Sequence, residues 1–415
     1  MLVLGDAVPR STPHAEHLDR MSAAAPGTKI PPTVKGLSLV SLFNDLASEM
    51  VYPLLPALVT GPLGAGALAL GALDGAAELT SAALKVVSGR LADRPRWRAP
   101  LILGGYATAV LVRPMIAVAG AAWQVIGFRI IDRVGKGLRT PARDALIAAV
   151  TPPELRGRAF GFHRGADHFG AVLGSVAAWY LLERGLAVQD VIGWSAVPGV
   201  LAFLTLAIVL RGTRITGVAP GNGSGPSAAD AVGRIFWGPV LVLAALTFFR
   251  VPEALLLLRL QDLGVGVPAI PLVWAGLHVV RSGSSYPGGW ISDHLGPRVT
   301  VAAGGLLFAV VAVALGRELP PAGAVAAFLL LGPVAGLTES AERALVARLA
   351  PVRTGRGFGL YHALIGVTAL PAGLAFGALY QRAGGPAALL GSALGMVISV
   401  ALWIVITTAN ARRTR

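Results

Sequence analysis

The chain has 415 residues, of which 54% are hydrophobic and only 13% are charged, and its mean hydropathy is +0.69. Soluble proteins average about 25% charged residues, so this composition excludes an ordinary soluble enzyme and indicates a polytopic membrane protein. The formal net charge of +14 lies largely on arginines between apolar segments, so it does not predict a nucleic-acid partner. Without cysteine the chain has no disulfide or thiolate site, and no motif suggests a metal or a cofactor.

The apolar residues form a series of predicted membrane spans. A spanning helix needs about 20 mainly apolar residues, and a Gly/Ser/Pro-rich linker (GNGSGPSAAD) divides the candidates into two sets of six. We therefore expect an all-α membrane protein of twelve helices in two pseudo-symmetric six-helix bundles. The expected spans are 35–59, 64–89, 99–119, 122–148, 157–182, 190–210, 235–258, 268–291, 298–316, 321–349, 356–381 and 386–409.

The loops predict the domain boundaries and the orientation. Arginine and lysine are concentrated in alternate loops, in the linker and in the C-terminal tail, which places both termini in the cytoplasm. The N-terminal tail lacks the features of a signal peptide and is expected to be disordered. The expected parts are a cytoplasmic tail (1–33), an N-terminal bundle (34–211), a cytoplasmic linker (212–234), a C-terminal bundle (235–410) and a second tail (411–415).

The first span carries Asp45 and Glu49 one helical turn apart, with Tyr52 on the same face and Asn44 beside them. Two acids so close repel each other when both are ionised. A carboxyl that is neutral when buried and charged when exposed is what a proton carrier needs, so both acids are candidates for proton coupling. The alternative is a structural ion pair with a neighbouring helix. On the second span Glu78 lies mid-helix and is a candidate for the substrate cavity.

The fourth span has a charged stripe. Arg129, Asp132, Arg133, Lys136 and Arg143 fall at steps of three, four or seven residues from one another along the helix, apart from the adjacent pair Asp132 and Arg133, so they line one stripe. A charge at mid-membrane costs roughly 2.5–3.5 kcal/mol, so this face must meet water, a partner helix or substrate. Because arginine binds carboxylates and phosphates in a bidentate way, the stripe favours a substrate with an anionic group. The alternative is internal neutralisation by the acids.

Two further groups complete the candidates. On the fifth span His163 and Asp167 lie one turn apart and suit either a proton relay or a gate. In the second half, Arg250 and Glu253 flank Pro252, which predicts an ion pair beside a helix break.

The two halves also share sequence motifs. SGRLADR at 88–94 matches GGWISDH at 288–294, and GRAFGFHR at 157–164 matches GRGFGLYH at 355–362. Two related six-helix halves are typical of transporters whose site lies at the membrane midplane between repeats.

On these motifs the chain resembles a permease of the major facilitator superfamily over residues 34–410. The stretch GRLADRPRWR from Gly89 and its copy GWISDHLGPR resemble the family pattern G-x-L-a-D-R-x-G-R-K, from which the first departs at Pro95 and Arg96. The resemblance implies that Asp93 pairs with Arg143 or with a residue near Arg356. Arg129 also resembles the family's fourth-helix arginine. The segments FND…SEM.YP..P and DR.GKG.RT..RDALI resemble a prokaryotic subgroup.

Together these observations assign three sets of residues. Proton coupling is assigned to Asp45, Glu49, Asp132, His163 and Asp167; substrate binding to Asn44, Tyr52, Glu78, Arg129, Arg133, Arg250, Glu253 and His278; and gating to Asp93, Arg94, Lys136, Arg139, Arg143, Asp293, Glu339 and Glu342.

We therefore expect a monomeric secondary transporter in the inner (plasma) membrane that works by alternating access and has no enzymatic activity. Protons and a small organic solute with an anionic group are the expected partners within the bilayer, and export is favoured over import. Three alternatives stay open. They are a multidrug exporter with a wide aromatic cavity, a lipid or lysolipid exporter with charge in one half only, and a membrane sensor that binds its ligand without transport.

Overall fold

The structure is a computed structural model that describes residues 29–92, 94–152, 155–212, 234–349 and 354–413. These residues are almost entirely helical and contain no strand, so the predicted all-α fold is confirmed. Where two helical elements follow each other along one axis, as the helices on either side of the Tyr52–Leu54 turn do, they are described together as one helical rod.

The described residues before the linker form six rods. Proline explains the interruption of the first, because it lacks an N–H donor and disfavours the helical conformation of the residue before it. The elements are α2 (Pro32–Val51) with η1 (Tyr52–Leu54) and α3 (Leu55–Thr60), α4 (Ala67–Ala92), α5 (Pro95–Met115) with η2 (Ile116–Val118), α6 (Ala122–Val150), α7 (Arg156–Glu183), and α8 (Val188–Trp194) with α9 (Ala196–Gly212).

The described residues after the linker also form six rods. The last two are a single element in which the chain reverses at Gly384, whose φ of 83° is accessible to glycine at no steric cost. The elements are α10 (Arg234–Phe248) with α11 (Glu253–Asp262), η4 (Val267–Ala269) with α12 (Ile270–Leu295), α13 (Pro297–Leu315), α14 (Pro321–Leu329) with α15 (Leu331–Leu349), and α16 (Thr354–Arg413).

Hydropathy and length alone identify fewer spans than the rods. Seven segments of the described chain are long and apolar enough to cross a membrane, one of them being the 49-residue stretch Tyr361–Ala409 that contains the reversal. The rods outside this set are those of α2, α6, α7 and α12. These four helices carry most of the polar residues singled out in the sequence. The number twelve therefore rests on the joined rods rather than on hydropathy.

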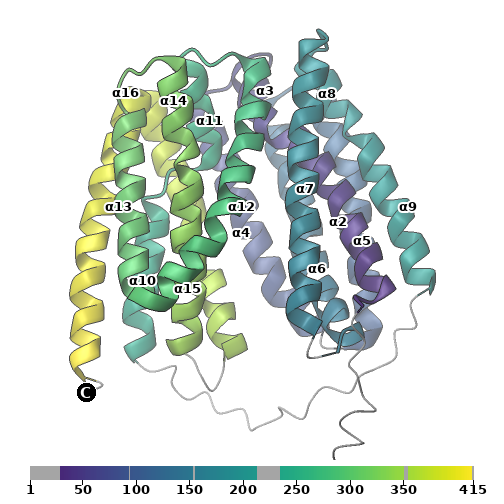
Figure 1. Ribbon diagram of the computed structural model, residues 1–415. Helices are drawn as coiled ribbons and strands as arrows, with labels where there is room; N and C mark the ends of the chain where they lie inside the picture. Colours follow the sequence, from purple (N-terminus) through teal and green to yellow (C-terminus); the bar gives the residue numbers. More distant parts are fainter. Residues whose placement is uncertain (1–28, 93, 153–154, 213–233, 350–353, 414–415) are drawn as a thin grey trace, which may run out of the picture.

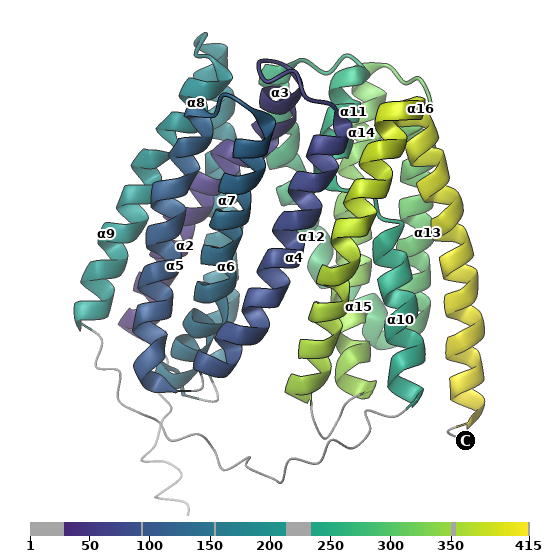
Figure 2. The ribbon, with the colours of Figure 1, turned by 180° about the vertical axis from the view of Figure 1, so that it is seen from behind.

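The rods form two bundles that stand side by side (Figure 1), one from α2 to α9 and the other from α10 to α16. The view from behind (Figure 2) shows α4 of the first bundle next to the first arm of α16. The end of α9, the start of α10 and the end of α16 lie at the same end of the molecule, which we call the linker end. The opposite end, where α3 and α11 lie, we call the closed end.

Glycines bring the two halves into backbone contact near the closed end. A side chain at Gly71 of α4 would overlap the carbonyl oxygen of Gly373 of α16, and one at Gly373 would overlap that of Gly71. Small residues of this kind let membrane helices approach closely, where packing rather than the hydrophobic effect holds them. A hydrogen bond reinforces the contact: the Leu68 backbone N–H donates to Oε1 of Gln381 at 3.1 Å.

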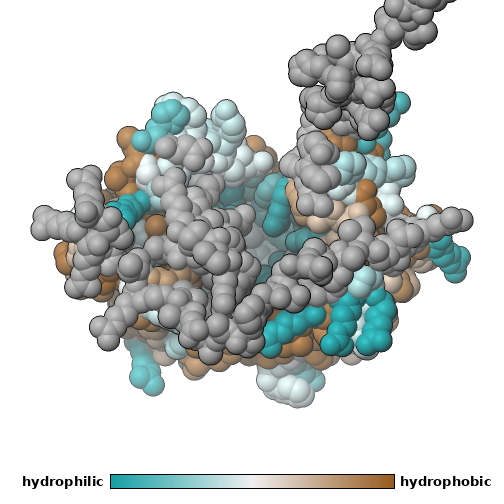
Figure 3. Space-filling model, turned by 90° about the horizontal axis from the view of Figure 1, so that it is seen from below, coloured by the Kyte–Doolittle hydropathy of each residue, from teal (hydrophilic) through white to brown (hydrophobic). Residues whose placement is uncertain are grey.

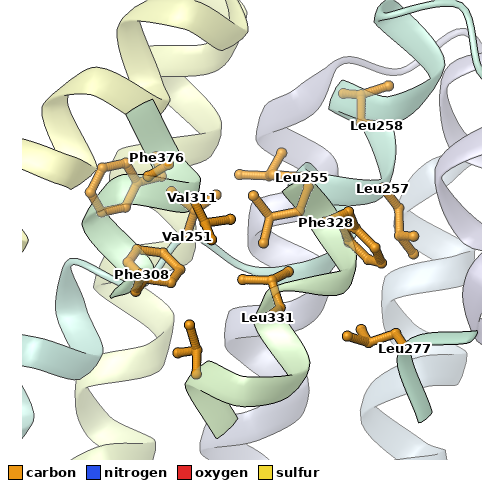
Figure 4. Packing of buried hydrophobic residues seen from close by; sticks show 14 of the residues in the cluster. Val251, Leu255, Leu257, Leu258, Leu277, Phe308, Val311, Phe328, Leu331 and Phe376 are labelled. Carbon is orange, nitrogen blue, oxygen red and sulfur yellow. The ribbon is translucent and has the colours of Figure 1, made fainter. Parts of the chain in front are cut away.

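The core of the second half holds α11 in place. Leu255, Leu257 and Leu258 are at most 8% exposed and lie among aromatic side chains of the neighbouring helices, including Phe328 of α14 (Figure 4). This packing positions the first turn of α11, which begins at Glu253 beside the space between the bundles.

Candidate functional site

A cavity of about 550 Å³ lies between the two bundles. Figure 3, a view of the linker end, shows hydrophilic residues in a hollow between them. Both halves contribute charged side chains to its wall. From the first half these are Glu49, Asp74, Glu78, Arg133 and Lys136, and from the second Arg250, Glu253, Arg281 and Glu339, together with His278. A cavity with charges of both signs suits a polar solute better than an apolar one.

Glu49 joins the two halves at the cavity. Nε1 of Trp274 in α12 donates a hydrogen bond of 2.7 Å to Glu49 Oε2, and His278 Nε2 lies 3.6 Å from the same oxygen. The ring of Tyr52 lies 5.2 Å from that of Trp274, which adds an aromatic contact across the same boundary. The sequence singled out Glu49, Tyr52 and His278 but missed Trp274. Its position one turn before His278, on the same helix face, was the available signal.

Asp74 makes a second connection between the halves. Its Oδ2 accepts a hydrogen bond of 3.0 Å from the Tyr52 hydroxyl and another of 3.0 Å from the backbone N–H of Ala254. That N–H belongs to the first turn of α11, where backbone donors have no partner within the helix. The carboxylate of one half therefore caps a helix of the other. Asp74 lies one turn before Glu78 in the sequence, but no sequence pattern predicts this role.

The acidic and basic residues of the second half form pairs between helices. Glu253 accepts a hydrogen bond of 2.7 Å from Arg281 of α12, and Arg250 lies 3.9 Å from Glu342, which also accepts from the Tyr361 hydroxyl. The predicted ion pair between Arg250 and Glu253 is wrong. The predicted break at Pro252 is present, and it separates the two side chains so that each meets a different helix.

The charged stripe of α6 divides into two parts. Asp132 is fully buried, accepts a hydrogen bond of 2.9 Å from Arg113 of α5 and lies 3.4 Å from Arg129. Arg129 is also buried, and its guanidinium lies 5.0 Å from the centre of the Tyr52 ring. Arg133, a turn further along, lines the cavity.

Lys136 lines the cavity as well, although the sequence suggested a gate for it. Within the part of the chain that the structure describes, neither Arg133 nor Lys136 forms an ion pair.

A second polar cluster lies inside the first half, towards the linker end. His163 is buried, with its ring nitrogens 3.4 Å from the hydroxyls of Ser38 and Ser41 and Nε2 3.7 Å from Asp167. Arg143 donates to Ser41 at 2.8 Å and to its neighbour Asp144 at 3.1 Å.

Arg139 is part of the same bundle interior. It stacks over Tyr106 and donates to the Gly105 carbonyl at 3.1 Å. In this conformation both Arg139 and Arg143 serve their own bundle rather than a contact between the halves.

The remaining predicted residues are placed as follows. The side-chain amide of Asn44 donates to the Asp45 carboxylate at 2.9 Å, and the backbone carbonyl of Asn44 accepts from Arg113 at 2.8 Å. Arg94 is exposed at the start of α5, and Glu339, for which the sequence suggested a gate, lies on the cavity wall. Asp93 and the side chain of Asp293 lie outside the described residues, so the expected partner of Asp93 is not seen. The described residues contain no cluster of potential metal ligands.

Comparison with known proteins gives a consistent family. Residues 37–258 match the sequence model of the Major Facilitator Superfamily. The chain is 27% identical over 383 residues to an uncharacterised transporter of this type from Methanocaldococcus jannaschii, covering 89% of this chain and 94% of the relative. It is 31% identical over 176 residues to the multidrug resistance protein MdtH of Photorhabdus laumondii, covering 42% of this chain and 43% of that protein.

Among solved structures, a peptide transporter (POT) in complex with sulfate superposes with a TM-score of 0.76 at 14% identity, covering 95% of this chain and 98% of that one. At that identity the match supports the fold. The superposition agrees with the family match, with the two-bundle helical fold and with the charged cavity between the bundles.

Proposed function

Because the chain belongs to the major facilitator superfamily of transporters, we propose that it is a proton-coupled secondary transporter of a small organic solute with an anionic group, working by alternating access. In this proposal the protein is a monomer in the plasma membrane, and both of its termini lie in the cytoplasm. The cavity then opens towards the cytoplasm, and the solute leaves the cell.

The observation that carries the proposal is the pair of cations on α6. Arg133 and Lys136 line the cavity and form no ion pair with any described residue, whereas Glu253 and Arg281 of the opposite wall bond to each other. A cation that is paired within the protein must give up that partner to bind a ligand, and an unpaired one does not. The anionic group of the solute is therefore assigned to Arg133 and Lys136.

Proton coupling is assigned first to Glu49. This carboxyl accepts a hydrogen bond from Trp274 across the boundary between the halves and faces His278 at 3.6 Å. Opening of the closed end has to break this contact, and protonation removes the charge that attracts the two partners. Protonation and conformational change would thus be linked through one residue.

Export is supported by the relative named as a multidrug resistance protein, which matches part of the chain. The same similarity favours a second candidate function, efflux of lipophilic cations. In that case the acids of the wall, rather than Arg133 and Lys136, would bind the solute.

A thermal-shift screen of the purified protein separates these candidates. The panel contains organic anions, amino acids, lysolipids and cationic drugs, each tested at two pH values. A ligand at 100 times its dissociation constant stabilises the protein by about 2.7 kcal/mol, which is measurable. We expect hits among solutes with an anionic group. These hits should disappear in Arg133→Gln and persist in Arg184→Gln, a substitution directly after the last residue of α7 at the closed end. Hits confined to cationic drugs and unaffected by Arg133→Gln would support drug efflux instead.

A flux measurement then tests the coupling. The protein is reconstituted in liposomes that contain a pH-sensitive dye, and the strongest hit is added to one side. Proton movement on addition of the hit, absent from empty liposomes, is the expected result. Solute movement without any proton movement would contradict the coupling.

A further inference from the structure

Three charged side chains of the cavity wall have no hydrogen-bond or ion-pair partner among the residues that the structure describes. Glu78 of α4 is exposed to the cavity and makes no hydrogen bond or ion pair with a described residue, and the same holds for Arg133 and Lys136 of α6. Glu78 interacts electrostatically with Lys85 of its own helix and with both cations of α6. By contrast, Glu49, Asp74 and Glu253 each accept a hydrogen bond from a named donor. An acid and two cations thus face the same space without neutralising one another directly.

The packing of α4 against α6 places Glu78 and Arg133 at a similar depth, with Lys136 about one turn further towards the linker end. The Ser88 hydroxyl donates to the Gly137 carbonyl at 2.7 Å, and a Cβ added to Gly137 would lie 3.1 Å from the Ser81 carbonyl oxygen. Both helices run from the closed end to the linker end. Glu78 lies one turn before Ser81, and Arg133 lies about one turn before Gly137, so the two side chains start from the same level.

This arrangement is a small fixed dipole on the cavity wall. Its negative end is on α4 and its positive end is on α6, and the two helices are in direct contact. A solute with a carboxylate alone would satisfy the cations and leave the Glu78 carboxylate unpaired beside another negative charge. A solute with both charges satisfies all three side chains.

We propose that the transported solute is a zwitterion whose ammonium and acidic groups are separated by a few atoms, as in an amino acid, with the ammonium on Glu78 and the acidic group on Arg133 and Lys136. The inference rests on the proposed function and specifies the substrate class of the same cavity. It makes Glu78 the residue that selects against simple organic anions.

The test compares matched probes that differ by one charged group. Melting temperatures of the purified full-length protein are measured with the twenty common amino acids, β-alanine and γ-aminobutyrate. For phenylalanine the acid-only analogue is 3-phenylpropionate and the amine-only analogue is phenethylamine; for leucine they are 4-methylpentanoate and isoamylamine. Phenyl phosphate serves as a dianionic probe. We expect at least one zwitterion to bind about tenfold or more tightly than both of its analogues, since a lost charged hydrogen bond costs that much.

Variants assign the two ends of the solute. Glu78→Gln should abolish the preference for the zwitterion over its acid-only analogue. Arg133→Gln should remove the binding of the zwitterion and of the acid-only analogue. Glu183→Gln, which removes the same charge at the closed end of α7, should change neither the preference nor the binding. The preference of the unmodified protein is measured without any variant, so it tests the inference even if a substitution prevents folding.

The outcomes separate the inference from the function on which it rests. An acid-only analogue that binds as tightly as its amino acid and depends on Arg133 would overturn the zwitterion and leave an anion transporter. Tightest binding by phenyl phosphate, or no binding by any amino acid, would overturn it as well. Binding of zwitterions that is insensitive to Arg133→Gln would overturn the anion site of the proposed function itself.

Discussion

In the proposed function, Glu49 is the residue that links protonation to the contact between the halves. In Glu49→Gln the amide oxygen can still accept from Trp274, but the charge that attracts His278 is gone, so the variant resembles a permanently protonated carboxyl. We expect exchange of solute across the membrane to continue and accumulation driven by a pH gradient to fall at least about tenfold, equivalent to about 1.4 kcal/mol. Both are measured in proteoliposomes with a solute found in the screen.

The matched control is Glu183→Gln, whose side chain is exposed at the last residue of α7, at the closed end. If accumulation by Glu49→Gln stays fully pH-driven, Glu49 is not the proton carrier. Asp45→Asn, one turn towards the linker end, is then the next variant to measure.

Asp132 should matter for stability more than for coupling. Its carboxylate is the common partner of Arg113 and Arg129, and all three side chains are at most 5% exposed. Asp132→Asn leaves two buried guanidinium groups without a counter-charge, a change that costs about 3–5 kcal/mol when one partner of a buried pair is removed. We expect a marked drop in melting temperature and in the yield of folded protein. A stable variant that had lost its response to pH would instead return Asp132 to the proton pathway.

Single residues on the cavity wall could be predicted from sequence to the extent that they are charged. Glu49, Glu78 and Arg133 stand out because a charged side chain in an apolar membrane helix is energetically costly and is retained only for a structural or functional role. Trp274 does not stand out, because an aromatic side chain in such a helix carries no such cost. Arg129 is buried beside Asp132, which also bonds to Arg113 of α5, whereas Arg133 lines the cavity. No pattern within α6 reveals that α5 is its neighbour.

At the scale of elements, the first turn of α11 is held by a residue of the other half. Loss of a side chain that caps a helix start costs about 0.5–2 kcal/mol, and here the cost falls only on the conformation in which Asp74 reaches Ala254. Asp74→Ala should therefore shift the population towards opening of the closed end. Because the chain has no native cysteine, spin labels on Pro62→Cys and Pro268→Cys report the distance across that end without background.

A longer distance in Asp74→Ala than in the parent is the expected result. The control is Asp190→Asn, an exposed acid in the first turn of α8 that lies within one half. An unchanged distance distribution in Asp74→Ala would show that the cap does not hold the closed end.

The elements themselves were predictable where proline or glycine punctuates the sequence. The break at Pro252 and the turn between the last two spans both follow from local backbone chemistry. The interruption between α8 and α9 at Ser195 was not predicted, and neither was the one at Leu330 between α14 and α15. The sequence also gives no direct sign that α4 pairs with α16, since these helices are about 300 residues apart and the glycines that join them resemble many others.

For the whole molecule, alternating access requires that the halves separate at the closed end while they approach at the linker end. The contacts between the halves on the closed side of the cavity include specific polar ones. Among the described residues these are the Leu68–Gln381 hydrogen bond, the Asp74 cap and the Glu49–Trp274 hydrogen bond, beside the glycine contact of α4 with α16. None is a large apolar interface within one bundle, so breaking them leaves each bundle intact. A rigid-body movement of one half against the other is the motion that this arrangement favours.

A covalent link between the halves should therefore stop transport without preventing binding. Leu68 and Gln381 are in contact at the closed end, where the Leu68 N–H donates to the Gln381 side chain. In Leu68→Cys combined with Gln381→Cys, a short thiol-reactive cross-linker that can be cleaved by reduction should abolish solute flux, and reduction should restore it. The cavity would still be reached from the linker end, so the thermal shift with ligand should persist. The same treatment of Val118→Cys with Trp194→Cys, both within the first half, should leave the flux unchanged. Full transport by the cross-linked protein would mean that the closed end does not open during the cycle.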